Sequence, residues 1–259
     1  MKEELSPAKK ALLAQWLKGR AQTQQQHIPK RPADSPLVLS FPQQRQLFLE
    51  MLDRGTAVNN LTVLLELKGK LEFEAFEASA NAIVARHEAL RMRFSFGLGM
   101  PVPEVLAPFE LEIPIVDLRE EAGDEQEAIA RRLAEEAVRQ PFDLSRAPLI
   151  RLKLYQLSAD RNWLLLVIHH TIADGWSLGV FLKELLQNYQ AIGAGHSATS
   201  PALAIQYADF AHWQIDAARA KTFEPALAYW KGQLAGELPV LDLPTDRQRD
   251  ARQTFSGGT

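Results

Sequence analysis

The stretch that most constrains the fold is Trp163–His170, in which an apolar run leads directly into two adjacent histidines. An uninterrupted apolar run of this length predicts a buried β-strand. The segment before it, Leu149–Leu157, alternates apolar and polar residues, which is the pattern of a second strand. The short polar segment between them predicts a turn, so we expect a β-hairpin that ends at the histidine pair.

Helical and extended patterns alternate along the rest of the chain from residue 39 onward. A hairpin combined with a mixed order of strands favours an α/β fold with a mixed sheet sandwich over a doubly wound parallel sheet. The expected helices are 40–52, 72–87, 124–139, 177–189, 204–213 and 223–234, and the further expected strands are 61–67 and 91–96.

Composition excludes several classes of function. The net charge of −3 gives no basis for electrostatic capture of nucleic acid. The chain has no cysteine, so disulfides, cysteine nucleophiles and thiolate metal sites are excluded. No apolar run reaches the length of a membrane span, and the charged first residues lack the apolar core of a signal peptide. We therefore expect a cytoplasmic protein that binds neither membrane nor nucleic acid.

The histidine pair overlaps a second pattern, Gly175-Trp-Ser-Leu-Gly179, which fits the G-x-S-x-G signature of serine hydrolases. In that interpretation Ser177 is a nucleophile. The position argues against it, because six residues separate the histidine pair at the end of the apolar run from Ser177, whereas an elbow serine follows its strand directly. The simpler interpretation is that Ser177 caps the helix that follows it.

Adjacent histidines at the end of a strand point to opposite faces of the sheet. His169 and His170 therefore cannot both bind one metal ion, and no metal is expected. We expect one ring to face the interior and the other a cleft, where a neutral imidazole is a suitable proton acceptor near neutral pH. Asp174-Gly175 predicts a tight turn directly behind the pair.

Four segments, in this order, resemble the sequence motifs of condensation domains of nonribosomal peptide synthetases. The resemblance extends from about residue 36 to the end of the chain. Ser40–Leu49 resembles "SxAQxRLWFL", with Pro42 in place of Ala; Arg86–Phe94 resembles "RHExLRTxF", with Met92 in place of Thr; His169–Ser177 matches "HHxxxDGWS"; and Tyr207–Trp213 matches "YxDFAxW".

This resemblance implies a chloramphenicol-acetyltransferase-like fold with two lobes. Residues 36–200 would form the N-terminal lobe, and residues 201–259 the crossing segment and the start of the second lobe. Residues 1–35 carry seven Lys or Arg against three Asp or Glu and predict a short helix and a polar linker. Their role is left open between a helix packed on its own domain and a docking or spacer element.

The implied reaction is amide-bond formation between a donor acyl or peptidyl thioester and an acceptor aminoacyl thioester. Both substrates would arrive on the phosphopantetheine arms of peptidyl carrier proteins, with no cofactor bound directly. The expected partners are these carrier proteins and the adjoining second lobe or downstream synthetase modules. The resemblance implies that the histidine motif lies in a tunnel between the two lobes. This chain alone is expected to be inactive, because half of the wall of that tunnel belongs to the second lobe. The non-catalytic alternative is a carrier-protein docking fragment.

Site residues follow from the same resemblance. His170 is expected to face the reacting amine, as a general base or as a positioning group, with His169 beside it. Backbone N–H groups near Gly175 are expected to stabilise the developing oxyanion. Asp174 is expected to pair with Arg86 or Arg91 and thereby support the turn. His87, on an apolar helix face, is expected to be a packed core residue, and Tyr207 and Trp213 are expected to be packing residues.

Overall fold

A four-stranded mixed sheet forms the centre of the molecule in the computed structural model, which describes residues 27–52, 55–198, 201–241 and 244. The strand order is β1 (Asn60–Lys68), β6 (Arg161–His169), β5 (Ile150–Gln156) and β4 (Ile115–Asp117). β1 and β5 each pair with β6 in antiparallel fashion, and β4 is parallel to β5. The mixed sheet and the β5–β6 hairpin predicted from the sequence are thus confirmed.

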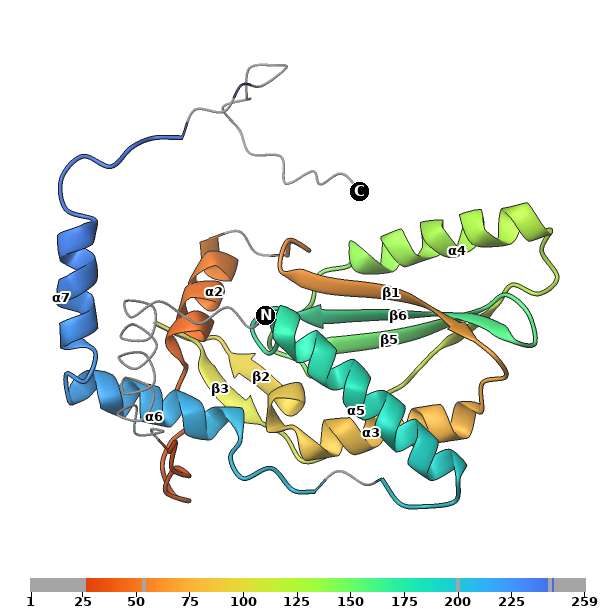
Figure 1. The fold of residues 1–259 in the computed structure, drawn as a ribbon, viewed down its shortest axis with the longest axis horizontal. Coiled ribbons are helices and arrows are strands. Elements are labelled where there is room, and N and C mark those ends of the chain that lie inside the picture. The colour runs from red at the N-terminus through yellow and green to blue at the C-terminus, as the bar shows by residue number, and fades with distance from the viewer. Residues whose placement is uncertain (1–26, 53–54, 199–200, 242–243, 245–259) are drawn as a thin grey trace, which may run out of the picture.

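Helices cover both faces of this sheet (Figure 1). α3 (Phe73–Arg86) and α5 (Gly175–Gly193) lie together on one face, and α4 (Gly123–Val138) lies on the other. The two helical layers are required because the central strand is apolar on both sides, so each side must be removed from water.

The residues of β6 alternate between two separate hydrophobic clusters. Leu164, Leu166 and Ile168 belong to the cluster that faces α3 and α5. Trp163, Leu165 and Val167 belong to the smaller cluster that faces α4. Because side chains alternate along a strand, residue 169 continues the α4 side and residue 170 the α3–α5 side. The strand period therefore sends the two histidines in opposite directions.

The remaining elements surround the end of the sheet where β6 delivers the histidines. They are α2 (Phe41–Leu52), a 3₁₀ turn (Glu88–Arg91), the hairpin β2 (Met92–Ser95) and β3 (Val102–Val105), and α6 (Tyr207–Arg219), which α7 (Glu224–Gln233) follows along the chain. α6 is tied back to α2, because the Tyr207 hydroxyl lies 2.7 Å from Ser40 Oγ and Gln214 Oε1 accepts from the backbone of Phe41.

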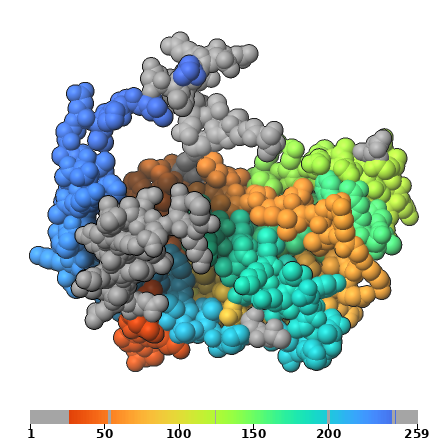
Figure 2. Space-filling model, viewed as in Figure 1, coloured from red at the N-terminus to blue at the C-terminus, as the bar shows by residue number. Residues whose placement is uncertain are grey.

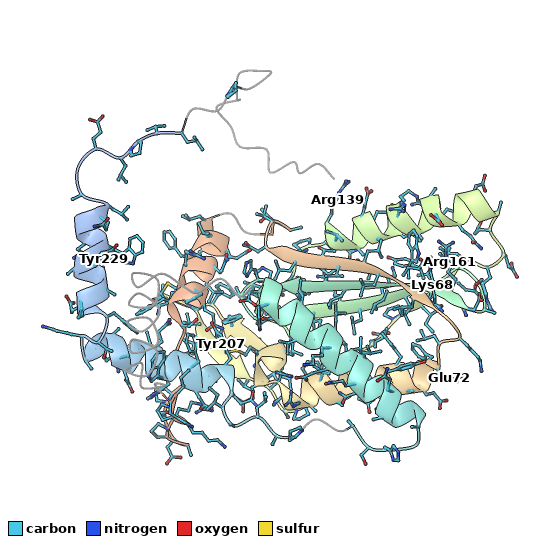
Figure 3. All side chains as sticks on the ribbon, in the orientation of Figure 1. Lys68, Glu72, Arg139, Arg161, Tyr207 and Tyr229 are labelled. Carbon is cyan, nitrogen blue, oxygen red and sulfur yellow. The ribbon has the colours of Figure 1, made fainter. Side chains whose placement is uncertain are left out.

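α7 has no buried residue; in Figure 1 it lies away from the sheet, and in Figure 2 it forms a column at the edge of the molecule. Tyr229 and Trp230 on α7 stack on each other edge to face and are each 58% exposed (Tyr229 is labelled in Figure 3). None of the helices in the described ranges is long and apolar enough to cross a membrane.

The predicted helices and strands from residue 40 onward are present, with bounds that move by a few residues. The largest difference is the helix predicted at 204–213, which runs instead from Tyr207 to Arg219. The helix predicted within residues 1–26 lies outside the described residues. Of the segment before α2, the backbone N–H of Arg31 donates to Asp209 on α6.

Candidate active site

A pocket of about 680 Å³ opens at the end of β6, between α2, α5 and α6. Leu166, Ile168 and His170 lie in its wall, in the order that a strand period of two residues gives. From a segment later in the chain, α6 contributes Tyr207 and Phe210. The pocket therefore forms where segments that are far apart along the chain meet at the strand end.

The tautomer of His170 is assigned by its hydrogen bond to Ala173. His170 Nδ1 lies 2.9 Å from the carbonyl oxygen of Ala173, which can only accept. Nδ1 therefore carries the proton, and Nε2 of the neutral ring has a free lone pair. Because His170 is half-buried in the pocket wall, a proton acceptor is available to whatever occupies the pocket.

His169 lies on the interior side and uses both ring nitrogens within the protein. Its Nδ1 accepts from the backbone N–H of Thr171 at 3.2 Å, so the proton of the neutral ring is on Nε2. Nε2 lies 3.2 Å from Glu50 Oε1 on α2, which also accepts from Asn59 Nδ2 at 2.7 Å. With an exposed fraction of 1%, His169 connects β6 to α2 and does not line the pocket.

The carboxyl group of Glu50 responds to two opposing influences. Burial raises its pKa, whereas the hydrogen bonds from His169 and Asn59 lower it, and the net effect is a pKa below the ordinary value. Glu50 is therefore ionised near neutral pH, as the acceptor role in this network requires.

The turn behind His170 is a capping box at the start of α5. Asp174 is the N-cap residue, and its Oδ1 accepts from the backbone N–H of Ser177 at 2.8 Å and from Ser177 Oγ at 2.6 Å. Ser177 Oγ in return accepts from the backbone N–H of Asp174. These hydrogen bonds from Ser177 hold the pKa of Asp174 below its ordinary range.

One sequence prediction about this turn needs correction. Asp174 caps the helix, and Ser177 is its partner three residues later, because the helix begins at Gly175 rather than at Ser177. The same geometry counts against the hydrolase alternative, which the position of Ser177 in the sequence already disfavoured. Ser177 lies inside the first helical turn, and its hydroxyl is hydrogen-bonded to a carboxylate instead of an imidazole.

The predicted pairing of Asp174 with Arg86 or Arg91 is also wrong. Arg86 forms an ion pair with Glu184 on α5 and donates from Nε to the carbonyl oxygen of Pro201. Arg91 is buried and donates to the backbone carbonyl groups of Val84 and Leu106. Both guanidinium groups thus connect α3 to its surroundings. The carboxylate of Asp174 is hydrogen-bonded by Ser177 instead.

The sequence predictions missed or misassigned three pocket residues. His87 was expected in the core, but it lies in the pocket wall with Nε2 2.8 Å from Glu184 Oε2. Tyr207 (labelled in Figure 3) was expected to pack only, but its hydroxyl lies 2.7 Å from Ser40 Oγ at the base of α2, and burial raises its pKa. Gln46, on the buried face of α2, is the third. Its polar type at an inward-facing helix position was the available signal.

The fold and the pocket together define a class: an α/β sandwich whose central strand presents one imidazole to a pocket and the next to the interior. Residues 34–259 match the family model described as "Condensation domain". The chain therefore belongs to the condensation domain family found in nonribosomal peptide synthetases, and its fold is chloramphenicol-acetyltransferase-like.

Individual relatives agree with this assignment. A linear gramicidin synthase from Brevibacillus parabrevis is 42% identical over 230 residues, which is 89% of this chain and 4% of the relative. The X-domain from teicoplanin biosynthesis, solved in complex with OxyB, is 30% identical with a TM-score of 0.70 and covers 86% of this chain. The first condensation domain of the CDA synthetase, at 22% identity and a TM-score of 0.68, shares the fold.

The chain spans a small part of its curated relatives and about half of its solved ones. It covers 48% of the teicoplanin X-domain chain and 51% of the CDA condensation domain chain. Within this chain, the part that matches the family model contains β6, the strand that leads into both histidines.

Proposed function

We propose that this chain takes part in amide-bond formation between two thioester-bound substrates. The observation that carries the proposal is His170, whose Nδ1 proton is held by Ala173 while Nε2 is left as a free acceptor in the pocket wall. Membership of the condensation domain family supports the same reaction. The class of enzyme is an acyltransferase that forms amide bonds.

In the proposed reaction the acceptor amine attacks the carbonyl carbon of the donor thioester directly. A C–N bond forms, the C–S bond breaks, and the amine loses one proton as the thiol leaves with one. His170 Nε2 either accepts that proton as a general base or orients the amine by accepting its hydrogen bond. No acyl-enzyme intermediate is required, which fits a pocket in which Ser177 is already bonded to Asp174.

The start of α5 would stabilise negative charge on the thioester oxygen. In the described part of the chain, the backbone N–H groups of Gly175 and Trp176 have no protein acceptor, as is usual for the first turn of a helix. They lie directly after the turn that holds His170 and Asp174, and the positive end of the helix dipole adds to their effect. Ser177 would support this arrangement through its hydrogen bonds to Asp174, and Arg86 would hold α5 more remotely through its ion pair with Glu184.

Substrates on the phosphopantetheine arms of donor and acceptor carrier proteins fit this reaction, with no cofactor bound by the chain itself. We assign residues 36–200 to the N-terminal lobe and 201–259 to the crossing segment and the start of the second lobe. Support comes from the coverage of about half of each of two solved relatives. The cytoplasmic location expected from the sequence stays a prediction.

The test is a condensation assay with loaded donor and acceptor carrier proteins. It compares residues 1–259 alone with a complete condensation domain that contains them, each with native His170 and with His170→Ala. We expect no product from residues 1–259 alone, and product from the complete domain that His170→Ala removes. His212→Ala is the matched control, because His212 pairs with Asp216 on α6 and lies outside the pocket. Undiminished turnover by His170→Ala would refute the assignment.

A second candidate is a binding module without turnover. It is favoured by the teicoplanin X-domain, a relative of the same fold that was solved in complex with another protein, OxyB. A titration with a phosphopantetheine-loaded carrier protein separates the two candidates. Binding by the complete domain with no product over the same concentration range would support the binding module.

A further inference from the structure

The buried face of α2 is polar, which is the reverse of the usual arrangement. Three of its four buried residues are Gln43, Gln46 and Glu50, whereas four of its exposed residues are large and apolar: Phe41, Phe48, Leu49 and Leu52. A surface helix normally buries its apolar stripe and exposes its polar one. The inward polar groups of α2 therefore need partners in the interior or in the pocket.

Two of the three have such partners within the protein. Gln43 Oε1 accepts from the backbone N–H of Ser40 at 3.1 Å, and its Nε2 donates to the carbonyl oxygen of Thr171 at 3.3 Å. Glu50 accepts from His169 and Asn59. These two residues anchor the helix to the strand end.

Gln46 differs from both. Its exposed fraction is 8%, and its Oε1 is fully buried without a hydrogen-bond partner among the described residues. A buried polar group without a partner loses its hydrogen bonds to water and gains none in the protein, which destabilises the folded state. Its presence therefore needs an explanation.

The position of Gln46 supplies one. It lies in the wall of the pocket that contains His170, one helical turn from Gln43. In the motif "SxAQxRLWFL" that Ser40–Leu49 resembles, this position is leucine, which would fill the same wall without an unpaired polar group. The polar residue is thus a departure of this chain from the pattern, in the wall of the pocket that contains His170.

We propose that Gln46 is a specificity-determining residue that hydrogen-bonds an amide group of the substrate. A carboxamide offers an acceptor and a donor side by side, which matches the N–H and C=O of an amide. This inference rests on the proposed function. The amide has two possible sources, the pantetheine arm or a peptide bond of the acyl group, and the test distinguishes them.

The experiment is an NMR titration of residues 1–259, labelled with ¹⁵N, with three small thioesters. S-butyryl-N-acetylcysteamine carries only the arm amide, the ethyl thioester of N-acetylglycine carries only an acyl amide, and butyryl ethyl thioester carries neither. The Gln46 side-chain resonance reports the contact, and dissociation constants are compared between the native chain, Gln46→Met and Gln187→Met. Methionine keeps the length of glutamine without its hydrogen bonds, and Gln187 is an exposed residue of α5 outside the pocket.

We expect Gln46→Met to weaken one or both amide ligands by roughly twofold to tenfold, the range of one net hydrogen bond, and to leave butyryl ethyl thioester unweakened. The ligand that loses affinity identifies the source of the amide. Gln187→Met is expected to change none of the three constants. The thermal midpoint of Gln46→Met is expected to stay level or rise, because an unpaired buried group is removed.

Equal changes for all three ligands, no change for any, or no shift of the Gln46 resonance would overturn the assignment. The proposed function fails separately, through His170→Ala in the condensation assay. A preference for amide ligands that disappears in Gln46→Met, in a domain that does not condense, would reject the reaction and keep the Gln46 contact.

Discussion

Two regions lie back to back at the end of β6 and use the same residue type in opposite ways. The interior region consists of His169, Glu50, Asn59 and Thr171, and both ring nitrogens of His169 have protein partners there. In the pocket region His170 has one nitrogen bonded to Ala173 and the other open. The strand period alone separates them, so the face of the sheet, and not the residue type, decides which histidine has protein partners on both nitrogens and which presents an open nitrogen to the pocket.

The largest expected effect is a loss of catalytic rate when the pocket region is altered. His170→Ala in a complete condensation domain should lower the rate of amide formation by about 10²–10⁴-fold, since it removes Nε2, the proposed acceptor for the reacting amine. It should lower the free energy of unfolding by only about 1 kcal/mol or less, because one half-exposed hydrogen bond is lost. Product formation and urea unfolding of the same variant measure both. If His170→Ala loses enough unfolding free energy to explain its lower rate of amide formation, His170 would be a structural residue like His169.

The second largest expected effect is a loss of unfolding free energy when the interior region is altered. His169→Ala leaves Glu50 buried with Asn59 as its remaining partner and should cost about 3 kcal/mol of unfolding free energy. Glu50→Ala and the double variant complete a cycle, and the coupling between the two residues should be at least about 1 kcal/mol. Purely additive losses, measured by urea unfolding, would mean that the His169–Glu50 contact contributes nothing of its own.

The opposite directions of the two rings were predictable from the sequence, because they follow from alternation along one strongly apolar strand. The roles of the supporting residues were not. Glu50 is 119 residues from His169 in sequence, and only tertiary packing of α2 against the strand end brings them together. The prediction for His87 was wrong because this residue lies just past the end of α3, where the 3.6-residue period no longer indicates the direction of the side chain.

The wrong prediction for Asp174 has a similar physical origin. A pairing between charged residues looked plausible because Arg86 and Arg91 lie in a neighbouring motif. A local capping box three residues away, however, requires no long-range positioning and satisfies the same carboxylate. Local hydrogen bonds of this kind can be predicted from the sequence once the start of the helix is known. The predicted start of this helix was wrong by two residues, and the capping box was missed for that reason.

A third prediction sharpens the description of the pocket region. Asp174→Ala removes the N-cap of α5 and should cost about 1 kcal/mol of unfolding free energy, whereas Asp174→Asn should cost clearly less, because asparagine also caps helices well. Arg86→Ala combined with Asp174→Ala should give additive losses, since the two side chains share no partner among the described residues. A strong coupling in chemical unfolding would support a direct arginine pairing after all.

The smallest expected effect is on the pH dependence of stability, and it compares the carboxylates of the two regions. The pKa values of Glu50 and Asp174 are both lower in the folded chain than in ordinary carboxyl groups. As the pH falls, the unfolded state therefore takes up protons first. The stability that each carboxylate contributes is complete above its unfolded pKa, near pH 4 to 4.5, and is lost as the pH falls through its lower folded pKa.

Glu50→Gln and Asp174→Asn remove these two titrations one at a time while keeping polar groups in place. In urea unfolding between pH 7 and pH 3.5, the stability gap between the native chain and Glu50→Gln should narrow as the pH falls, because the native chain loses what the variant never had. The gap to Asp174→Asn should narrow in the same range. For Asp174 the cause is the pair of hydrogen bonds from Ser177. Ser177→Ala removes the Oγ hydrogen bond and keeps the backbone one, so it should flatten the acid dependence only in part, less than Asp174→Asn does, and leave the Glu50 contribution intact. If the stability gap between the native chain and Glu50→Gln stays constant with pH, the Glu50 carboxylate is no better stabilised in the interior than in water. The ionised Glu50 would then no longer distinguish the surroundings of His169 from those of His170.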